Sequence, residues 1–175
     1  MRTPLLMMIA LVLVGCESMT VSECKVADWG RVGFNDGARG ESDSLIAAYT
    51  EDCGKAGIQP NARLYRQGWD SGIQRFCTAA NGWREGLQGN SSKASVCRGQ
   101  PGYEAFLHYL LAGTQVHSTT VRMSQNAAEI NKLQRRLEES KSDEEKSRLR
   151  EQLRDIDGEQ NRLRHLLSQQ QRSAP

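Results

Sequence analysis

Acidic side chains beside glycines and aromatic residues are the strongest hint of catalysis in this chain. Four of them, if brought together, would form a carboxylate cluster: Asp28, Asp36, Asp70 and Glu85. Because paired carboxylates carry out acid–base hydrolysis, a hydrolase is one hypothesis. Acids in such places also cap helices or pair with nearby arginines, for example Arg39 and Arg66. We favour this structural interpretation and expect a protein without catalytic residues, not an enzyme.

The histidines do not have the spacing of a metal or catalytic motif. His108, His117 and His165 occur in neither a His-x-x-x-His nor a His-Glu-x-x-His arrangement. A Gly-Lys-Ser/Thr phosphate-binding loop is also absent from the sequence. We therefore expect no metal site and no cofactor.

The first of the five cysteines, Cys16, ends a segment that is typical of a secretory signal. Residues 1–15 contain one basic residue, Arg2, followed by an apolar run over 5–14 and then Gly15. This run is shorter than the roughly 20 residues that span a bilayer. The residues Leu13-Val14-Gly15-Cys16 resemble the lipobox of bacterial lipoproteins, whose cysteine carries diacylglycerol. We predict a cleaved signal peptide over 1–15, lipidation (palmitate) at Cys16 and a lipidated tether over 16–23; an ordinary signal peptide is the alternative.

A repeated pattern of glycines marks the segment that follows. Residues 33–40 and 82–89 both read Gly-aromatic-x-acid-Gly-x-x-Gly, and residues 68–72 form a shorter copy. Glycines four residues apart lie on one side of a helix and let another backbone approach closely. Turns with positive φ are the other structural possibility. We expect Trp29, Trp69 and Trp83 to be packing residues, with a platform for peptidoglycan or another glycan as the alternative.

The other four cysteines bracket the two full copies of this pattern. Cys24 and Cys53 flank the first copy, and Cys77 and Cys97 flank the second. A chain that leaves the reducing cytosol forms disulfides, so we predict two disulfide bonds. Sequential pairing is the simplest of three connectivities, all of which remain open. Zinc or redox chemistry is the weaker interpretation because no Cys-x-x-Cys pair occurs.

Residues 114–172 have the composition of long helices. Met123, Ala127, Ile130 and Leu137 recur at helical steps, with Leu133 beside them, and six further positions alternate by four and three: Leu149, Leu153, Ile156, Gln160, Leu163 and Leu167. Such a heptad pattern indicates a coiled coil. Residues 140–143 favour a turn, with Ser142 as N-cap and Glu145 as its capping-box partner. We predict an antiparallel helical hairpin; one unbroken helix pairing between chains is the alternative.

These observations together predict a mainly α-helical protein. A Gly- and aromatic-rich domain stapled by disulfides spans 24–113, the hairpin spans 114–172, and a disordered tail spans 173–175. The formal net charge of +2 falls to about +1 when Arg2 leaves with the signal, and Lys and Arg form no separate block. Nucleic acid is therefore not an expected partner.

The lipobox, Cys24-x-x-x-Asp28-Trp29, the glycine copies, Tyr65-x-x-Gly68 and the spaced cysteines resemble a proteobacterial lipoprotein family of unknown function, DUF2799. The resemblance covers about residues 16–113 and implies an envelope lipoprotein. Glu17 follows the cysteine instead of the Asp that often retains lipoproteins in the inner membrane, so the periplasmic face of the outer membrane is favoured. We expect a non-catalytic role in which the hairpin binds an envelope protein or a second copy.

Overall fold

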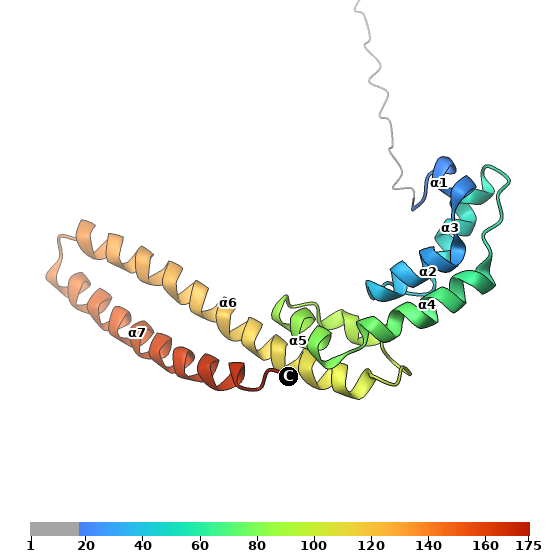
Figure 1. Cartoon of the computed structure of the whole chain (residues 1–175). Coiled ribbons are helices and arrows are strands. Elements are labelled where there is room, and N and C mark those ends of the chain that lie inside the picture. The colour runs from blue at the N-terminus through green and yellow to red at the C-terminus, as the bar shows by residue number, and fades with distance from the viewer. Residues whose placement is uncertain (1–17) are drawn as a thin grey trace, which may run out of the picture.

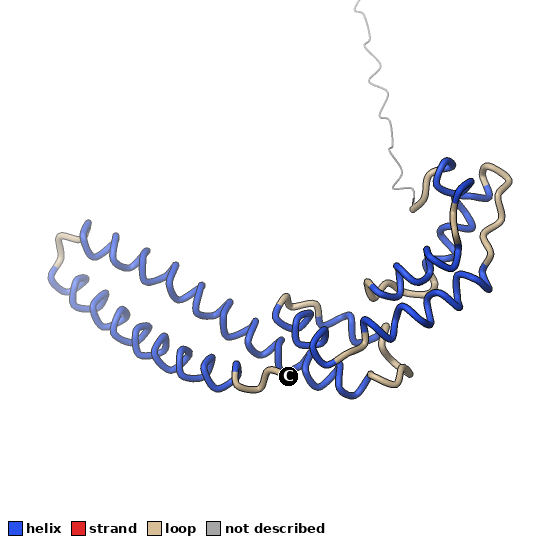
Figure 2. Tube along the Cα trace, viewed as in Figure 1, coloured by secondary structure: helices blue, strands red, loops and turns tan. Residues whose placement is uncertain are grey.

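A computed structural model describes residues 18–175 of the chain, and this part is mainly α-helical, as predicted (Figures 1 and 2). The described residues contain no strand. The signal peptide predicted over 1–15 and Cys16 lie outside this range. The elements are α1 (Val21–Val26), α2 (Trp29–Ala38), α3 (Leu45–Gly54), α4 (Ala62–Phe76), α5 (Ala79–Leu87), the 3-10 helix η1 (Ser91–Ser95), α6 (Tyr103–Glu139) and α7 (Asp143–Gln171).

The glycine copies pair helices at very close range. In the first pair, a β-carbon placed on Gly33 or Gly37 of α2 would lie closer than 3.0 Å to a backbone oxygen of α4, and one placed on Gly72 of α4 would meet α2 in the same way. Gly82 and Gly86 of α5 have the same relation to α6. The glycines therefore let two backbones touch, as their spacing predicts.

The third glycine of each full copy has a different role. Gly40 and Gly89 have positive φ values of 67° and 79°. Gly40 follows the end of α2, and Gly89 follows the end of α5. The residue after each glycine donates its N–H to the backbone carbonyl of the acidic residue in the copy: Glu41 to Asp36 and Asn90 to Glu85, both at 2.9 Å. This is a Schellman ending, which needs a left-handed residue. Both expected uses of glycine thus occur, at different positions of one motif.

The core of the stapled domain is aromatic and contains both disulfides. Tyr65, Phe106 and Ile73 are at most 1% exposed. The bridges join Cys24 to Cys53 and Cys77 to Cys97, so each closes around one full glycine copy. The core of a domain of this size contains few large side chains, so the two disulfides add stability that the core alone does not supply.

The hairpin is an antiparallel coiled coil of the second part of α6 with α7. Its contact positions on α6 alternate by three and four: Val116, Thr119, Met123, Asn126, Ile130, Leu133 and Leu137. Asn126 is buried, whereas Ala127, which we expected on this stripe, is exposed. On α7, Leu149 and Gln160 are buried, and Gln160 donates to the Met123 carbonyl at 3.3 Å.

The turn between α6 and α7 closes with polar side chains. The Ser142 hydroxyl accepts from the Glu145 N–H at 3.4 Å, which confirms the predicted N-cap. The Glu145 carboxylate does not return this bond in a capping box. Instead it accepts from Ser140 at 2.8 Å and from Arg136 at 3.2 Å, so it ties the end of α6 to the start of α7.

One helix joins the two parts of the molecule. The 37 residues of α6 pair with α5 at one end and with α7 at the other, without a break at residue 113. A helix of this length extends about 55 Å. The molecule is elongated and curved, with α1 and α3 at one end and the turn between α6 and α7 at the other (Figure 1).

Candidate functional site

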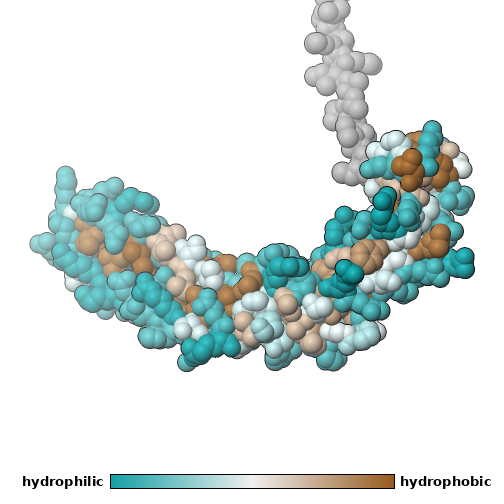
Figure 3. All heavy atoms as spheres, in the orientation of Figure 1, coloured by the Kyte–Doolittle hydropathy of each residue, from teal (hydrophilic) through white to brown (hydrophobic). Residues whose placement is uncertain are grey.

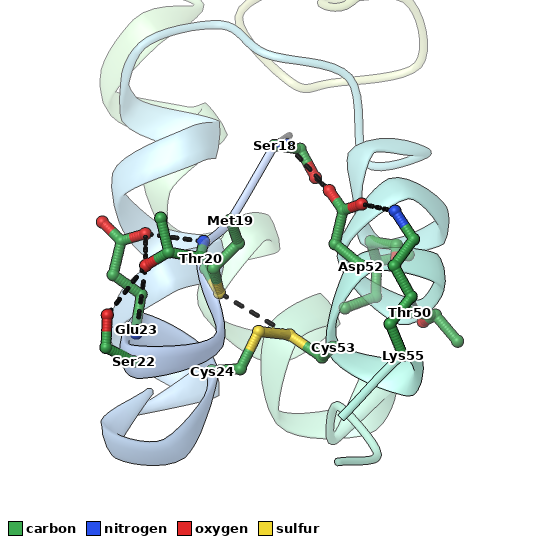
Figure 4. Close-up of a disulfide and its surroundings, with 11 residues drawn as sticks. Ser18, Met19, Thr20, Ser22, Glu23, Cys24, Thr50, Asp52, Cys53 and Lys55 are labelled. Carbon is green, nitrogen blue, oxygen red and sulfur yellow. Dashed lines mark hydrogen bonds and ion pairs between the residues drawn. A yellow bond between two sulfur atoms is a disulfide. The ribbon is translucent and has the colours of Figure 1, made fainter. Parts of the chain in front are cut away.

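The end of the molecule formed by α1 and α3 is held together by contacts between these helices and the residues before α1 (Figure 4). Both the backbone N–H and the hydroxyl of Ser18 donate to one oxygen of Asp52, at 2.7 and 2.6 Å. Lys55 donates to the other oxygen at 2.7 Å. The disulfide between Cys24 and Cys53 joins α1 to α3 beside these bonds. Ser18 is therefore fixed to the body of the domain.

Hydrogen bonds keep the Asp52 carboxylate charged. Lys55 first, and then Ser18, hold the pKa of this carboxyl well below its usual range. The carboxylate therefore keeps accepting the Ser18 bonds at any pH at which an ordinary aspartate is ionised.

Residues 18–23 of the tether predicted over 16–23 are bonded to the folded domain. Thr20 caps α1 by accepting from the Glu23 N–H, and the Glu23 carboxylate accepts from the Thr20 N–H in return at 2.8 Å. Since α1 begins at Val21 and Ser18 is bonded to Asp52, residues 18–23 belong to the folded domain. A local capping box and a contact 34 residues away in sequence together fix these residues.

A second polar site lies inside the domain, around Asp36. This residue of α2 is 1% exposed. One of its carboxylate oxygens accepts from the hydroxyls of Tyr49 and Tyr65, each at 3.0 Å, and the other accepts from Arg39 at 2.6 Å. These bonds connect α2, α3 and α4. A buried carboxylate whose two oxygens are both paired is a structural connector.

The two tyrosines stay protonated. Burial, followed by the negative charge of Asp36, raises the pKa of Tyr49 to about 12. The same two causes raise the pKa of Tyr65 well above its ordinary value. Both hydroxyls therefore remain donors to Asp36 at neutral pH.

We expect Asp36→Asn to lower the free energy of unfolding by about 1 to 3 kcal/mol. Both carboxylate oxygens of Asp36 accept hydrogen bonds, whereas an asparagine has one oxygen and an NH₂ group that faces a donor. Asp70→Asn is the matched control: Asp70 is an exposed partner of Arg66, and its replacement costs less than about 1 kcal/mol. Urea denaturation followed by tryptophan fluorescence measures both effects. Equal stability of the two variants would contradict the connector role of Asp36.

The four acids proposed as a hydrolytic cluster have separate hydrogen-bond partners. Asp28 caps α2 by accepting from the Arg31 N–H at 3.1 Å. Asp70 accepts from Arg66 at 2.9 Å, and Glu85 accepts from Asn90 at 2.9 Å. Asp28 is thus a helix cap, and Asp36 and Asp70 are ion-pair partners of Arg39 and Arg66, as we favoured from the sequence. Glu85 differs, because its partner is the neutral amide of Asn90.

The three tryptophans do not present the exposed platform of the glycan hypothesis. Trp29 is 8% and Trp69 is 4% exposed, and Trp83 is half-buried. The Trp29 ring packs beside Tyr49 at a centroid distance of 6.2 Å, and the Trp69 indole N–H donates to the Glu41 carbonyl at 2.8 Å. Trp29 and Trp69 are thus core residues, because the glycines beside them draw the helices together and enclose the rings.

The histidines are placed apart from these sites. The His117 ring nitrogen Nδ1 lies 3.0 Å from the Leu87 carbonyl oxygen, and the ring also lies against Gly89. His108 packs edge-on against Tyr109. Within residues 18–175, no group of three or more His, Cys, Asp or Glu side chains is arranged to hold a metal ion.

Three contacts between distant residues were not predicted from the sequence. Ser18 and Asp52 are 34 residues apart, and Asp36 lies 13 and 29 residues from its tyrosines. No local spacing signals such pairs.

Among the described helices, none combines the length and apolarity that crossing a bilayer requires.

A family model described as "Protein of unknown function (DUF2799)" matches residues 28–115. The match runs from the cap of α2 into the first third of α6, so it contains both glycine-paired helix pairs and leaves out the hairpin. No curated protein and no solved structure matches the chain.

Proposed function

This chain belongs to the DUF2799 family, and we propose that it is a non-catalytic envelope lipoprotein that holds a helical arm at a fixed position relative to a membrane. In this proposal the signal peptide is cleaved before Cys16, the cysteine carries acyl chains, and the protein lies on the periplasmic face of the outer membrane. The arm, residues 114–171, binds an envelope protein or a second copy of the chain.

The continuity of α6 is the observation that carries this proposal. Gly113 lies at the junction of domain and arm, and a β-carbon there would meet the backbone of α5. The backbone of α6 therefore packs directly on α5 at this point. From 114 to 139, α6 contains neither Gly nor Pro. Since helices bend sharply mainly at such residues, the arm cannot swing freely about the domain. A rigid connection of this kind suits a protein that presents a binding surface at a set distance.

The surface available on the arm is polar. Its apolar positions face the seam between α6 and α7, and the outer sides carry ion pairs such as Arg122 with Glu159 at 3.0 Å. Val121 and Leu166 are the large apolar residues of the arm that are exposed, at 41% and 42%. A partner would thus contact a mixed charged surface with few apolar anchors, which is typical of non-obligate interfaces.

Photo-crosslinking in cells tests the proposal. A photoreactive amino acid at Leu166 or Val121 of the arm should give one discrete adduct in the envelope, whereas the same residue at Leu64 of the stapled domain, 41% exposed, should not. The mass of the adduct distinguishes a second copy from another protein. Mass spectrometry of the mature protein should also find an acylated Cys16 at its N-terminus.

Two results would contradict the proposal. Absence of an adduct from both arm positions, with a monomer by light scattering, would remove the binding role. A mature chain without acyl groups would remove the anchor.

A further inference from the structure

We infer that the α1 end of the domain lies directly on the bilayer and that an apolar patch there contacts the lipid. The patch consists of exposed Val26 and of Met19, Ala27 and Val32, which are partly buried against the core. Together with Glu23, Asp28 and Arg31 these residues line one shallow depression of about 230 Å³. This inference rests on the anchor at Cys16 in the proposed function. It adds the orientation that the anchored domain adopts.

The length of chain between Ser18 and the anchor brings this patch to the membrane. Ser18 is bonded to Asp52 of α3, and α3 is joined to α1 by the disulfide of Cys24 with Cys53. Only two residue steps separate Ser18 from Cys16, and a chain covers at most about 3.6 Å per residue. The acylated residue therefore lies within about 7 Å of Ser18. A connection of this length holds the domain next to the lipid surface.

The exposure of α1 agrees with contact to an apolar phase. Val26 is 79% exposed, more than any other large apolar side chain that is exposed in the described chain, and Val21 of the same helix is 43% exposed. Figure 3 shows hydrophobic atoms gathered on the α1 end of the molecule. Covering an exposed valine with an apolar surface lowers the free energy, because the side chain leaves water. For a protein acylated at Cys16, the bilayer supplies such a surface.

Charges of both signs surround the patch. Lys25 and Arg31 form no ion pair among residues 18–175, so their charges are available to phosphate groups. Glu23 and Asp28 cap α1 and α2, and accepting a capping hydrogen bond does not remove the negative charge of a carboxylate. The charges beside the patch are therefore close to balanced, and apolar contact holds this end on the lipid while the two basic side chains reach headgroup phosphates.

Depth-dependent quenching tests this orientation. The protein, with both disulfides formed, is placed in phosphatidylethanolamine–phosphatidylglycerol vesicles with or without bromine on the acyl chains. It is held there by its native acyl chains or, for a chain that begins at Cys16, by a maleimide phospholipid on the Cys16 thiol. Val26→Trp is compared with Val121→Trp, an exposed valine of the arm, after subtraction of the emission of the unsubstituted chain.

Bromine should quench the emission from Val26→Trp and shift the remaining emission to shorter wavelength, and should leave Val121→Trp unchanged. In the unsubstituted chain, amide hydrogen exchange over residues 21–32 should be slower on vesicles than in the unanchored protein. Equal emission of Val26→Trp with and without bromine, or unchanged exchange, would overturn the inference. The maleimide form supplies the anchor chemically, so these results do not depend on whether cells acylate Cys16.

Discussion

Gly72→Ala is expected to lower the free energy of unfolding by about 2 to 4 kcal/mol, although alanine is the better helix former. The added methyl group would lie closer than 3.0 Å to the Phe34 carbonyl oxygen and close to the Ala38 nitrogen. Both atoms belong to the backbone of α2, so no side chain can move aside. The helices α2 and α4 would have to separate along their length, and the contacts around Trp69 would loosen with them.

Gly158→Ala is the matched control for this variant. Gly158 also lies inside a helix, α7, but the nearest atom to an added β-carbon is the end of the Arg162 side chain, at 3.8 Å. Here only the helix preference acts, and the substitution should stabilise the arm by about 1 kcal/mol. Urea denaturation followed by tryptophan fluorescence and by circular dichroism measures both variants. If Gly72→Ala were as stable as the unsubstituted protein, the backbones of α2 and α4 would not be in contact.

Replacing both Cys24 and Cys53 by alanine should destabilise the domain by about 3 to 4 kcal/mol. The bridge closes a separation of 29 residues, and the entropy that it removes from the unfolded chain grows with the logarithm of this length. The loss should be greatest at the end of the domain formed by α1 and α3, because this bond attaches α1 to α3. Hydrogen exchange over α1 and α3 should accelerate more than exchange over α7.

The second bridge provides the comparison. Cys77 and Cys97 are 20 residues apart, so the same relation gives a loss that is smaller by only a few tenths of a kcal/mol. Its removal should accelerate exchange near the start of α6 and leave α1 protected. Loss of α1 protection in both variants alike would show that α1 is not held locally by its own disulfide.

Local signals in the sequence were sufficient to predict a helical fold, the hairpin and the N-cap of its second helix. Ser142 caps α7 by accepting the backbone N–H of Glu145, as its place after the predicted turn indicated. The four-three alternation on α7 corresponds to its buried seam, with Gln160 included. These features depend on residues within one or two helical turns of each other, so the order of residue types along the chain is enough to predict them.

The surroundings of the candidate site residues depended on contacts between distant segments. The sequence placed Trp29 and Trp69 beside glycines, but only the close packing of α2 and α4 decides that both rings are buried instead of exposed. The acidic residues looked alike in sequence. The fold makes Asp36 a buried connector and Asp70 a surface ion-pair partner, because only Asp36 faces the hydroxyls that α3 and α4 bring to it.

The sequence by itself determined that this is a helical protein in which four of the five cysteines bracket a repeated glycine pattern. Residue type and spacing carry that information directly. Only the tertiary structure decided that Ser18 is bonded to Asp52 and that α6 passes unbroken from domain to arm. The physical reason is that these properties depend on which of many distant segments pack together, and burial and hydrogen bonding summed over the whole fold select that packing.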